Sequence, residues 1–436
     1  MKEVIKNIFD AKTYAVIGVS RNEKKVGHII FKNLLNSHKK IIGINPNTKK
    51  ILNQEIFSDL IETPYNIDVI IIASPPKTIP LILRQAGKRK IKYAIIISAG
   101  FSESNNKELE EHIKRVAIEE NIRILGPNSF GIIDTYQNLN TTFYSGNLNR
   151  GNIGFISQSG AIASAMLDKI NSFSKFISLG NSIDINFNNL IDYLIYDDKT
   201  KIICLYVESL QKNSGREFIE ICKKSKKPII VLKGGNSKSG QDAAKSHTAA
   251  LATDSEIYKG AFKQARLIQV DSVTELFDVA RILEKFQRIN KNTTIITNAG
   301  GFGVLSADYC ERYNIPLTKL SQKTIESLNK ILPSNWSKNN PIDIIGDAIP
   351  EDYKKVLEII EKDKETENII LILTPQHTSQ PEKVAKILNT IKKPLFTCFI
   401  GGEKINEAKK ILNQNKIINY SEPEYLCKTL SKIIRS

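Results

Sequence analysis

The stretch Asp68-Val-Ile-Ile-Ile-Ala73-Ser-Pro-Pro76 places an unbroken apolar run directly before a short loop. Continuous Ile/Val runs of this length are typical of strands that are covered on both faces, as in parallel sheets. The two prolines end the run, because proline cannot continue a central strand. The stretch therefore predicts a buried parallel strand whose carboxyl end opens into a loop.

Similar apolar runs lie on both sides of this stretch, and helical patterns such as Asn106–Glu120 separate them. The further strands expected before residue 130 are 14–18, 41–44, 93–98 and 123–125. Strands that alternate with helices predict a doubly wound parallel α/β sheet. Ligands of such sheets bind beyond the carboxyl ends of the strands, so the loops that follow the strands are candidate sites.

The same alternation begins again at Ile153 and at Thr293. Between the first two regions, Asp134–Asn152 is rich in Asn, Thr, Tyr and Gly and is interpreted as a linker. With 436 residues, the chain is long enough for several domains with full cores. We predict three α/β domains, which comprise residues 1–130, 145–290 and 291–436.

The composition limits the classes of partner that we expect for this chain. The net charge is +16, but the lysines are spread along the whole chain, without a run of five or six and without interleaved aromatic residues. We therefore expect no nucleic-acid partner, although a diffuse positive field favours anionic ligands. No run of eighteen apolar residues occurs, and the first residues lack the apolar core of a signal peptide, so we expect no membrane association.

The five cysteines lie far apart in the sequence, and none forms a C-x-x-C pair. This spacing argues against a zinc site and against a disulfide framework, so we expect no metal site. It also fits a protein of the reducing cytoplasm.

A loop of small and polar residues, Lys233–Thr253, follows an apolar run and carries His247 between Ser246 and Thr248. Long loops inside a well-patterned chain are often functional. A single histidine is compatible with a surface or capping role as well as with chemistry.

Two turns in the second and third regions share one pattern, in which a strand is followed by a small-residue turn and then by a helix. A helix N-terminus offers free N–H groups and the positive end of the helix dipole, which together form an anion site. A simple N-cap by Ser159 is the alternative. The expected phosphate-binding residues are Ser157, Gln158, Ser159, Gly160, Asn298, Gly300 and Gly301.

A dinucleotide site in the first region is disfavoured. The fingerprint requires G-x-G-x-x-G after the first strand and an acidic residue at the end of the second. Here Gly18 is followed by no glycine before Gly27, and the second strand closes with Asn45.

Taken together, these motifs resemble those of the nucleoside-diphosphate-forming acyl-CoA synthetases, the relatives of succinyl-CoA synthetase. The segment Ser246-His-Thr-Ala-Ala-Leu-Ala-Thr253 resembles the family's S-H-T-G-[AS]-L-A-G, with Ala249 and Thr253 in place of the two glycines. The resemblance implies that His247 is a catalytic residue that carries a phosphoryl group. It also implies that Glu208, at the position of the family's Y-I-E-[GS] glutamate, accepts a hydrogen bond from the imidazole.

The loops of the first region resemble the family's CoA-binding domain, in the motifs V-I-G-V-S-R, I-N-P-N, I-I-A-S-P-P, I-S-A-G-F and G-P-N-S-F-G. One departure is Ser129, where relatives often have cysteine, so we assign it no thiol chemistry. The residues that the resemblance implies for CoA binding are Gly18, Ser20, Arg21, Lys25, Asn45, Pro46, Ser74, Pro75, Ser98, Ala99 and Asn128.

The resemblance implies a Rossmann-like CoA-binding domain followed by two flavodoxin-like domains of the succinyl-CoA-ligase type. It implies the α subunit of an ADP-forming acyl-CoA synthetase, which interconverts acyl-CoA, ADP and phosphate with carboxylic acid, CoA and ATP through an acyl phosphate and a phosphohistidine. The sequence contains no G-x-x-x-x-G-K-[ST] loop and leaves no room for an ATP-grasp module. ADP or ATP with Mg²⁺ is therefore expected on an ATP-grasp β subunit, in an α2β2 assembly. The alternatives are a catalytically inactive CoA-binding regulatory protein and an NAD-dependent dehydrogenase.

Overall fold

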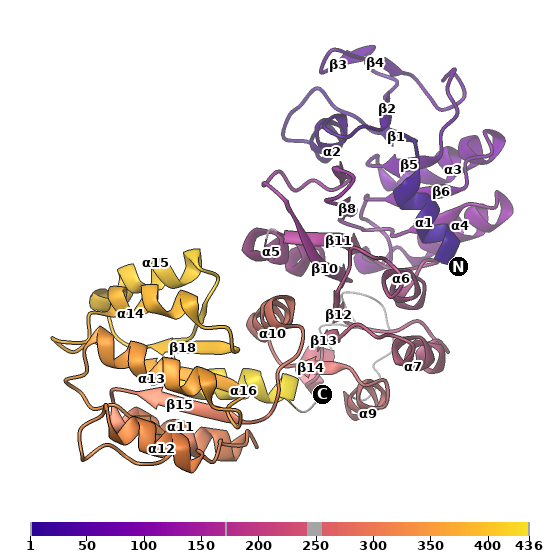
Figure 1. The fold of residues 1–436 in the computed structure, drawn as a ribbon. Coiled ribbons are helices and arrows are strands. Elements are labelled where there is room, and N and C mark those ends of the chain that lie inside the picture. Colours follow the sequence, from indigo (N-terminus) through magenta and orange to yellow (C-terminus); the bar gives the residue numbers. More distant parts are fainter. Residues whose placement is uncertain (1, 171, 242–254, 435–436) are drawn as a thin grey trace. The chain divides into compact units, whose positions relative to one another are not determined.

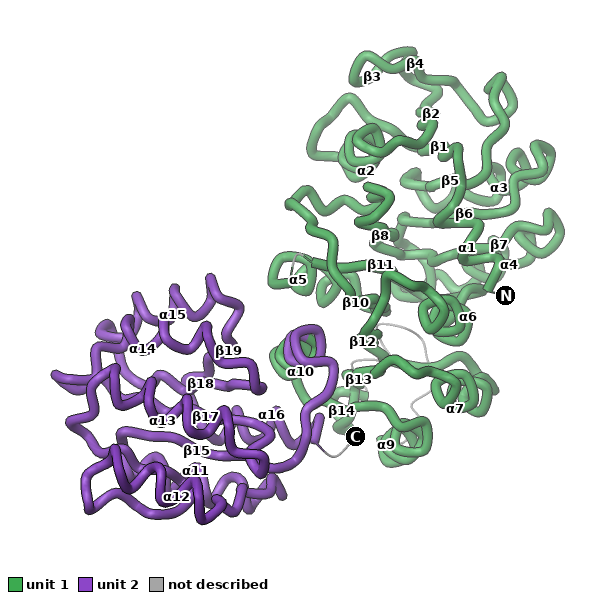
Figure 2. The backbone as a smooth tube through the Cα atoms, viewed as in Figure 1, with its two compact units in different colours: residues 1–280 green, residues 281–436 purple. Residues whose placement is uncertain are grey.

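The computed structural model describes residues 2–170, 172–241 and 255–434 (Figure 1). The chain divides into two compact units, Met1–Ala280 and Arg281–Ser436 (Figure 2). The first unit contains two β-sheets and the second unit contains one.

The first sheet has seven strands in the order β3-β4-β2-β1-β5-β6-β7. The five strands from β2 to β7 in this order are parallel, and they confirm the expected positions. They are β1 Thr13–Ile17, β2 Lys40–Ile44, β5 Val69–Ile72, β6 Tyr93–Ile96 and β7 Arg123–Leu125. The hairpin of β3 (Lys50–Ile51) and β4 (Gln54–Phe57) was not predicted. Its strands are too short to show a period in the sequence.

Helices cover both faces of this sheet. They are α1 Lys2–Asp10, α2 Val26–Leu35, α3 Ile79–Lys88 and α4 Lys107–Glu119. Successive residues of β1 enter different cores, because side chains alternate across a strand. Tyr14 and Val16 join one hydrophobic cluster, whereas Ala15 and Ile17 join another. The unbroken apolar run of β1 therefore reflects burial on both faces, as predicted.

The second sheet has the order β14-β13-β12-β10-β11-β8-β9. Its five parallel strands are β10 Asn149–Ser157, β11 Ser172–Ser178, β12 Ile202–Val207, β13 Ile229–Lys233 and β14 Ile268–Val270. Their helices are α5 Gly160–Ile170, α6 Phe187–Leu194, α7 Gly215–Lys223, α9 Ser255–Gln264 and α10 Val273–Phe286. Numbered from β10, the parallel strands follow the order 2-1-3-4-5, which is the flavodoxin-like arrangement.

The interpretation of Asp134–Asn152 as a linker is wrong. Strands β8 (Ile132–Asp134) and β9 (Leu139–Asn140) pair antiparallel with each other, and β8 pairs with β11. Thr141 is fully buried, and its hydroxyl accepts a hydrogen bond from the N–H of Ile132 at 2.8 Å. The polar side chains of this segment satisfy backbone groups inside the sheet, so polar composition does not mark a linker here.

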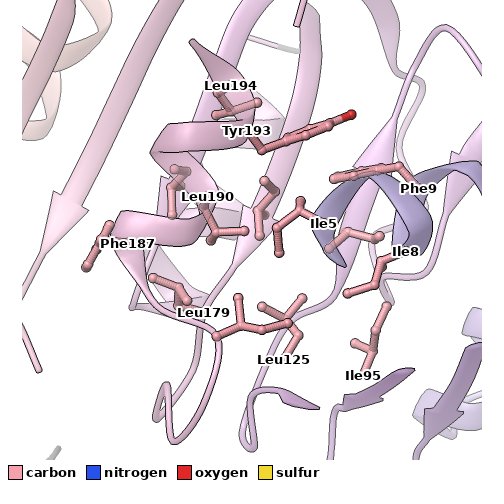
Figure 3. Close-up of a cluster of buried hydrophobic side chains, with 14 of the residues drawn as sticks. Ile5, Ile8, Phe9, Ile95, Leu125, Leu179, Phe187, Leu190, Tyr193 and Leu194 are labelled. Carbon is pink, nitrogen blue, oxygen red and sulfur yellow. The ribbon is translucent and has the colours of Figure 1, made fainter. Parts of the chain in front are cut away.

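The two sheets of the first unit share a hydrophobic core (Figure 3). Helix α1 contributes Ile5, Ile8 and Phe9 to this core, and the ring of Phe9 stacks on Tyr193 of α6 at a centroid distance of 5.4 Å. The guanidinium of Arg123 on β7 forms an ion pair of 2.8 Å with Asp184, which precedes α6. These contacts fix the two sheets against each other and so define the space between their loops.

The sheet of the second unit has the order β16-β15-β17-β18-β19, which again is flavodoxin-like. Its strands are β15 Thr293–Thr297, β16 Ile342–Asp343, β17 Asn368–Leu373, β18 Leu395–Phe399 and β19 Ile418–Asn419. Its helices are α11 Gly300–Arg312, α12 Gln322–Asn329, α13 Pro350–Lys362, α14 Pro381–Ile387, α15 Asn406–Gln414 and α16 Pro423–Ile434. The doubly wound fold class is confirmed, whereas the domain boundaries at about residues 130–145 and 290 stay a prediction.

Candidate functional site

A cavity of about 600 Å³ in the first unit lies where loops of its two sheets meet. Cavities of this size accommodate small-molecule ligands. The first sheet contributes loops that follow β5, β6 and β7, and the second sheet contributes loops that follow β10, β11 and β12. Eight residues that the sequence analysis selected line it: Ser74, Ser98, Ala99, Asn128, Gln158, Ser159, Gly160 and Glu208.

Short hydrogen bonds hold the loops of the first sheet together. The hydroxyl of Ser98 donates to the carbonyl of Ser74 at 2.6 Å, and the N–H of Asn128 donates to the carbonyl of Ser98 at 3.0 Å. Gly18 has a φ of +92°, and a Cβ atom there would lie 2.4 Å from the carbonyl oxygen of Ala73. Only glycine fits where the loops after β1 and β5 come this close. Strands β1 and β5 are neighbours at the point where the strand order reverses.

Gly27 lies against this turn, although it is nine residues from Gly18 in the sequence. A Cβ atom at Gly27 would lie 2.0 Å from the carbonyl oxygen of Gly18. Gly27 therefore allows helix α2 to approach the first strand closely, which is one of the tasks of glycine in dinucleotide sites. The spacing still differs from the dinucleotide fingerprint.

Other residues predicted for CoA binding lie outside the cavity lining. Asn45 uses its side chain within the fold, because its amide donates to the carbonyl of Val19 at 2.6 Å and its oxygen accepts from the N–H of Asn47 at 2.8 Å. Arg21 and Lys25 lie exposed in the loop between β1 and α2. The residues predicted for CoA binding that do not line the cavity are Gly18, Ser20, Arg21, Lys25, Asn45, Pro46 and Pro75, and Ser157, which was predicted to bind phosphate, does not line it either.

Ser129 lines the cavity but has a structural role in these contacts. Its hydroxyl donates to the carbonyl of Ser178 at 2.7 Å and accepts from the N–H of Gly131 at 3.0 Å. The side chain thus joins the end of the first sheet to β11 of the second sheet.

The turn before α5 presents a helix N-terminus to the cavity. Ser157 is fully buried and shapes the turn, since its hydroxyl donates to the carbonyl of Ser159 at 2.8 Å and accepts from the Ser159 N–H at 3.1 Å. The Ser159 hydroxyl accepts from the Ile162 N–H at 3.4 Å, which is a long and weak N-cap. The first N–H groups of α5 are therefore suited to bind an anion.

Glu208 follows β12 and is held by the turn after β10. The side-chain oxygen of Gln158 accepts hydrogen bonds from the N–H groups of Glu208 and Ser209, at 2.6 and 3.0 Å. This oxygen is therefore used for positioning, whereas the sequence analysis expected Gln158 to bind phosphate. Strands β10 and β12 are neighbours at the switch point of the second sheet, where ligands of this fold bind.

Two ionisable side chains lie close to Glu208. Burial, the charge of Glu208 and a hydrogen bond to that carboxylate raise the pKa of Tyr206 to about 12. Burial lowers the pKa of Lys233, while the negative charge of Glu208 opposes this shift. Tyr206, which lies near the end of β12, was not among the predicted site residues.

His247 lies outside the described residues, as do Ala249 and Thr253. The roles of His247 and Glu208 as a catalytic pair therefore stay predictions from the motif.

In the second unit, helix α11 begins at Gly300 without a side-chain cap. Asn298 is buried, and its amide pairs with Thr374 at the end of β17 through two hydrogen bonds of 2.9 Å each. Asn298 therefore fixes the turn rather than presenting its side chain to a ligand. Gly301 is exposed, and a Cβ atom there would meet nothing within 4 Å.

The described parts of the chain contain no cluster of three or more His, Cys, Asp or Glu side chains that could hold a metal ion. Within the same ranges, no helix has both the length and the apolar character that crossing a membrane requires.

Three family models match the chain in sequence order. They are a CoA binding domain over residues 12–135, a succinyl-CoA ligase like flavodoxin domain over residues 150–283 and a Ligase-CoA domain over residues 293–427. These descriptions agree with the expected series of one CoA-binding domain and two ligase-type domains.

Two similar curated relatives are named as ADP-forming ligases. The chain is 42% identical over 446 residues to an acetate–CoA ligase [ADP-forming] of Methanocaldococcus jannaschii, and this alignment covers 99% of the chain and 63% of the relative. It is 36% identical over 435 residues to the acetate–CoA ligase [ADP-forming] II subunit alpha of Pyrococcus furiosus, and this alignment covers 95% of the chain and 94% of the relative. The chain thus spans slightly less than two thirds of the first relative and almost all of the second.

Solved structures give the same result. An acetyl-coenzyme A synthetase 1 of Ca. Korarchaeum cryptofilum, solved in complex with phosphate and ADP, superposes with a TM-score of 0.93 at 31% identity. The match covers 99% of this chain and 96% of that chain.

Proposed function

This chain belongs to the family of ADP-forming acetate–CoA ligases, and we propose that it acts as the α subunit of such an enzyme. The enzyme converts acyl-CoA, ADP and phosphate into carboxylic acid, CoA and ATP, and the reverse reaction makes acyl-CoA. The single observation that carries this proposal is the cavity that combines the CoA-domain loops, the N-terminus of α5 and Glu208.

The first step is attack of phosphate on the thioester. The loops after β5, β6 and β7 hold the CoA end, with Ser74, Ser98 and Asn128 lining the cavity. The first N–H groups of α5, at Gly160 and Ala161, bind phosphate and stabilise negative charge as it develops. A phosphate oxygen bonds to the acyl carbon, the C–S bond breaks, and CoA leaves as the thiol after taking a proton. The product is an acyl phosphate.

The second step moves the phosphoryl group to the protein. Neutral His247 attacks phosphorus, the P–O bond to the acyl group breaks, and the carboxylic acid is released as the carboxylate. Glu208 accepts a hydrogen bond from the other imidazole nitrogen and stabilises the positive charge that forms on the ring. Glu208 suits this role because it lines the cavity beside the helix N-terminus that binds the phosphate.

The third step requires a partner. We propose an ATP-grasp β subunit that binds ADP with Mg²⁺ and receives the phosphoryl group from His247, in an α2β2 assembly. Two Pyrococcus furiosus relatives are named as alpha subunits, and the similar solved structure contains ADP and phosphate, which supports both the partner and these ligands. The cytoplasm remains the proposed location on the basis of the cysteine spacing.

Reconstitution tests this proposal. The chain is co-purified with the ATP-grasp subunit of its own organism and supplied with acetyl-CoA, ADP, Mg²⁺ and phosphate, and ATP is measured. ATP should form only when both subunits are present. Calorimetry of the isolated chain discriminates the alternatives, because a regulatory protein would bind CoA without supporting ATP formation, and a dehydrogenase would bind NAD more tightly than CoA.

A further inference from the structure

Asn181 lies in the loop that follows β11 of the second sheet, and it lines the cavity of about 600 Å³. Its side-chain nitrogen donates to a carboxylate oxygen of Glu103 at 2.7 Å and to one of Glu110 at 2.6 Å. Both acceptors belong to segments of the first sheet, since Glu103 follows β6 and Glu110 lies in α4. An amide nitrogen carries two hydrogens, so these two short bonds fix the orientation of the Asn181 amide.

Glu103 carries this contact to the loop after β6. Its other carboxylate oxygen accepts from the N–H of Gly100 at 2.6 Å and from the N–H of Phe101 at 3.1 Å. Burial raises the pKa of Glu103, but these two hydrogen bonds and the one from Asn181 lower it below its ordinary value, so the group is charged at neutral pH. Ser98, which lines the cavity, belongs to the same short loop.

The oxygen of the Asn181 amide contacts the loop after β7. It accepts from the side-chain nitrogen of Asn128 at 3.3 Å, and Asn128 also lines the cavity. Because the orientation of Asn181 is fixed, Asn128 turns its nitrogen towards Asn181, and its oxygen lies on the other side of the amide. No described residue donates to this oxygen, which is therefore available to an N–H group of a ligand.

The backbone of the same loop lies directly against the loop after β7. The N–H of Asn181 donates to the carbonyl of Pro127 at 2.9 Å. Gly180 has a φ of +58°, and a Cβ atom there would lie 2.1 Å from the carbonyl oxygen of Pro127 and 2.6 Å from that of Asn128. Only glycine allows this approach, so the loops of the two sheets meet closely at this point.

The charges of the first sheet indicate which part of CoA would occupy the cavity. Arg21 and Lys25, the cations among the residues predicted for CoA binding, do not line it. Arginine and lysine are the usual partners of phosphate groups, so we expect the phosphates of CoA near these cations. The uncharged pantetheine arm, whose amide groups both donate and accept hydrogen bonds, would then lie in the cavity beside Asn128.

We propose that Asn181 is a positioning residue for the pantetheine arm of CoA, which fixes the loops after β6 and β7 of the first sheet against the second sheet. The inference deepens the proposed function and rests on it, because CoA is there the ligand of these loops. Asn181 acts through Glu103 and Asn128. The affinity of the first sheet for CoA thus depends on a residue of the second sheet.

Asn181→Ala tests this role in the complete chain. The variant loses two hydrogen bonds to charged groups, and one such bond is enough to change an equilibrium by about 10-fold. We expect the dissociation constant of CoA, measured by calorimetry, to rise by about that factor. The dissociation constant of adenosine 3′,5′-bisphosphate, which lacks the pantetheine arm, should stay unchanged.

Asp184→Ala is the matched control, because Asp184 belongs to the same loop and also reaches the first sheet. Its carboxylate accepts from the N–H of Ile124 at 2.8 Å and pairs with Arg123 at 2.8 Å, but it does not line the cavity. Asp184→Ala should lower the temperature of thermal unfolding and leave the dissociation constant of CoA unchanged.

Two further variants separate hydrogen bonding from shape. Asn181→Asp keeps the shape of the side chain but places a third carboxylate beside Glu103 and Glu110, so it should weaken CoA binding more than Asn181→Ala. A purely steric role predicts the reverse order. Glu103→Gln keeps an oxygen for the N–H of Gly100 and loses the bond from Asn181. The double variant Asn181→Ala/Glu103→Gln should bind CoA little worse than either single variant, since both remove one interaction.

Unchanged affinity of Asn181→Ala for CoA would overturn the inference, and so would an equal loss of affinity for CoA and for adenosine 3′,5′-bisphosphate. In either case a wild-type chain that binds CoA leaves the proposed function standing. A wild-type chain that binds no CoA contradicts the proposed function itself, and the inference fails with it.

Discussion

The side-chain oxygen of Gln158 accepts a hydrogen bond from the backbone N–H of Glu208 at 2.6 Å. This bond joins the carboxyl ends of β10 and β12, which are neighbours at the switch point of the second sheet. It places the one charged side chain of the described cavity lining directly beside the helix N-terminus of α5. The proposed phosphate site and the Glu208 carboxylate are therefore held together by the same contact.

Gln158→Leu should slow phosphoryl labelling from acetyl-CoA and phosphate by about 10-fold or more, since two backbone N–H groups lose their acceptor and the Glu208 segment shifts. Gln211→Leu is the matched control. Gln211 also bridges two loops, but it does so by donating to the carbonyl of Ser182 and accepting from the side-chain amide of Asn186. Equal loss of labelling in both variants would contradict the positioning role of Gln158.

The buried ion cluster around Lys175 should dominate the stability of the second sheet. Lys175 is almost fully buried and lies 3.0 Å from Asp134 and 3.4 Å from Asp197. Lys175→Met leaves two carboxylates without their cation, and we expect a loss of about 3–5 kcal/mol in the free energy of unfolding. The exposed pair Lys410–Glu407 has the same 3.0 Å separation, and Lys410→Met should cost less than about 1 kcal/mol. Similar losses in urea titrations of both variants would refute this prediction.

The two glycines of the α11 turn should respond differently to alanine. A Cβ atom at Gly300 would lie 2.7 Å from a carboxylate oxygen of Asp343, whereas Gly301 has open space. Gly300→Ala should lower the free energy of unfolding by about 1–3 kcal/mol through overpacking. Gly301→Ala should change it by less than about 0.5 kcal/mol, as at unconstrained surface positions. Thermal unfolding of the two variants decides this, and the reverse order of stability would speak against the described turn.

All five cysteines are buried and free. Burial raises the pKa of Cys222 to about 12 and shifts the pKa of Cys398 upward as well. The thiolate is the reactive form, so at pH 8 these thiols should be alkylated by iodoacetamide far more slowly than a free cysteine. Mass spectrometry should find them unmodified in the native protein and modified in guanidinium chloride. Rapid alkylation of Cys222 or Cys398 in the native state would contradict the described burial.

The sequence predicted the architecture well where burial leaves a simple pattern. Strands such as β5 and β17 are covered on both faces, so their apolar runs are visible without any partner. The strands β3, β16 and β19 were beyond such reasoning, because two residues carry no period. The error at Asp134–Asn152 has a different cause, since the buried side chains of Thr135 and Thr141 there bond to the backbone of neighbouring strands.

In the candidate site, too, some features follow from the local sequence pattern and others depend on residues that are distant in the sequence. Ser98 and Ser159 line the cavity, as expected of loop residues that follow strands at the edge where ligands of this fold bind, and their roles in binding stay predictions. The uses of Gln158, Asn298 and Gly27 depend on partners distant in the sequence, namely Glu208, Thr374 and Gly18. Such pairings follow from the strand order, which the local sequence pattern does not contain.

The most direct test of the proposed function is whether His247 takes up a phosphoryl group. The isolated chain and its His247→Asn variant are incubated with acetyl-CoA and ³²P-phosphate, and the masses of the intact proteins are measured by mass spectrometry. We expect one phosphoryl adduct on the wild-type chain, none on His247→Asn, and equal affinity of both for CoA. A phosphoryl adduct that persists on His247→Asn, or a wild-type chain that binds CoA and acquires no adduct, would contradict it.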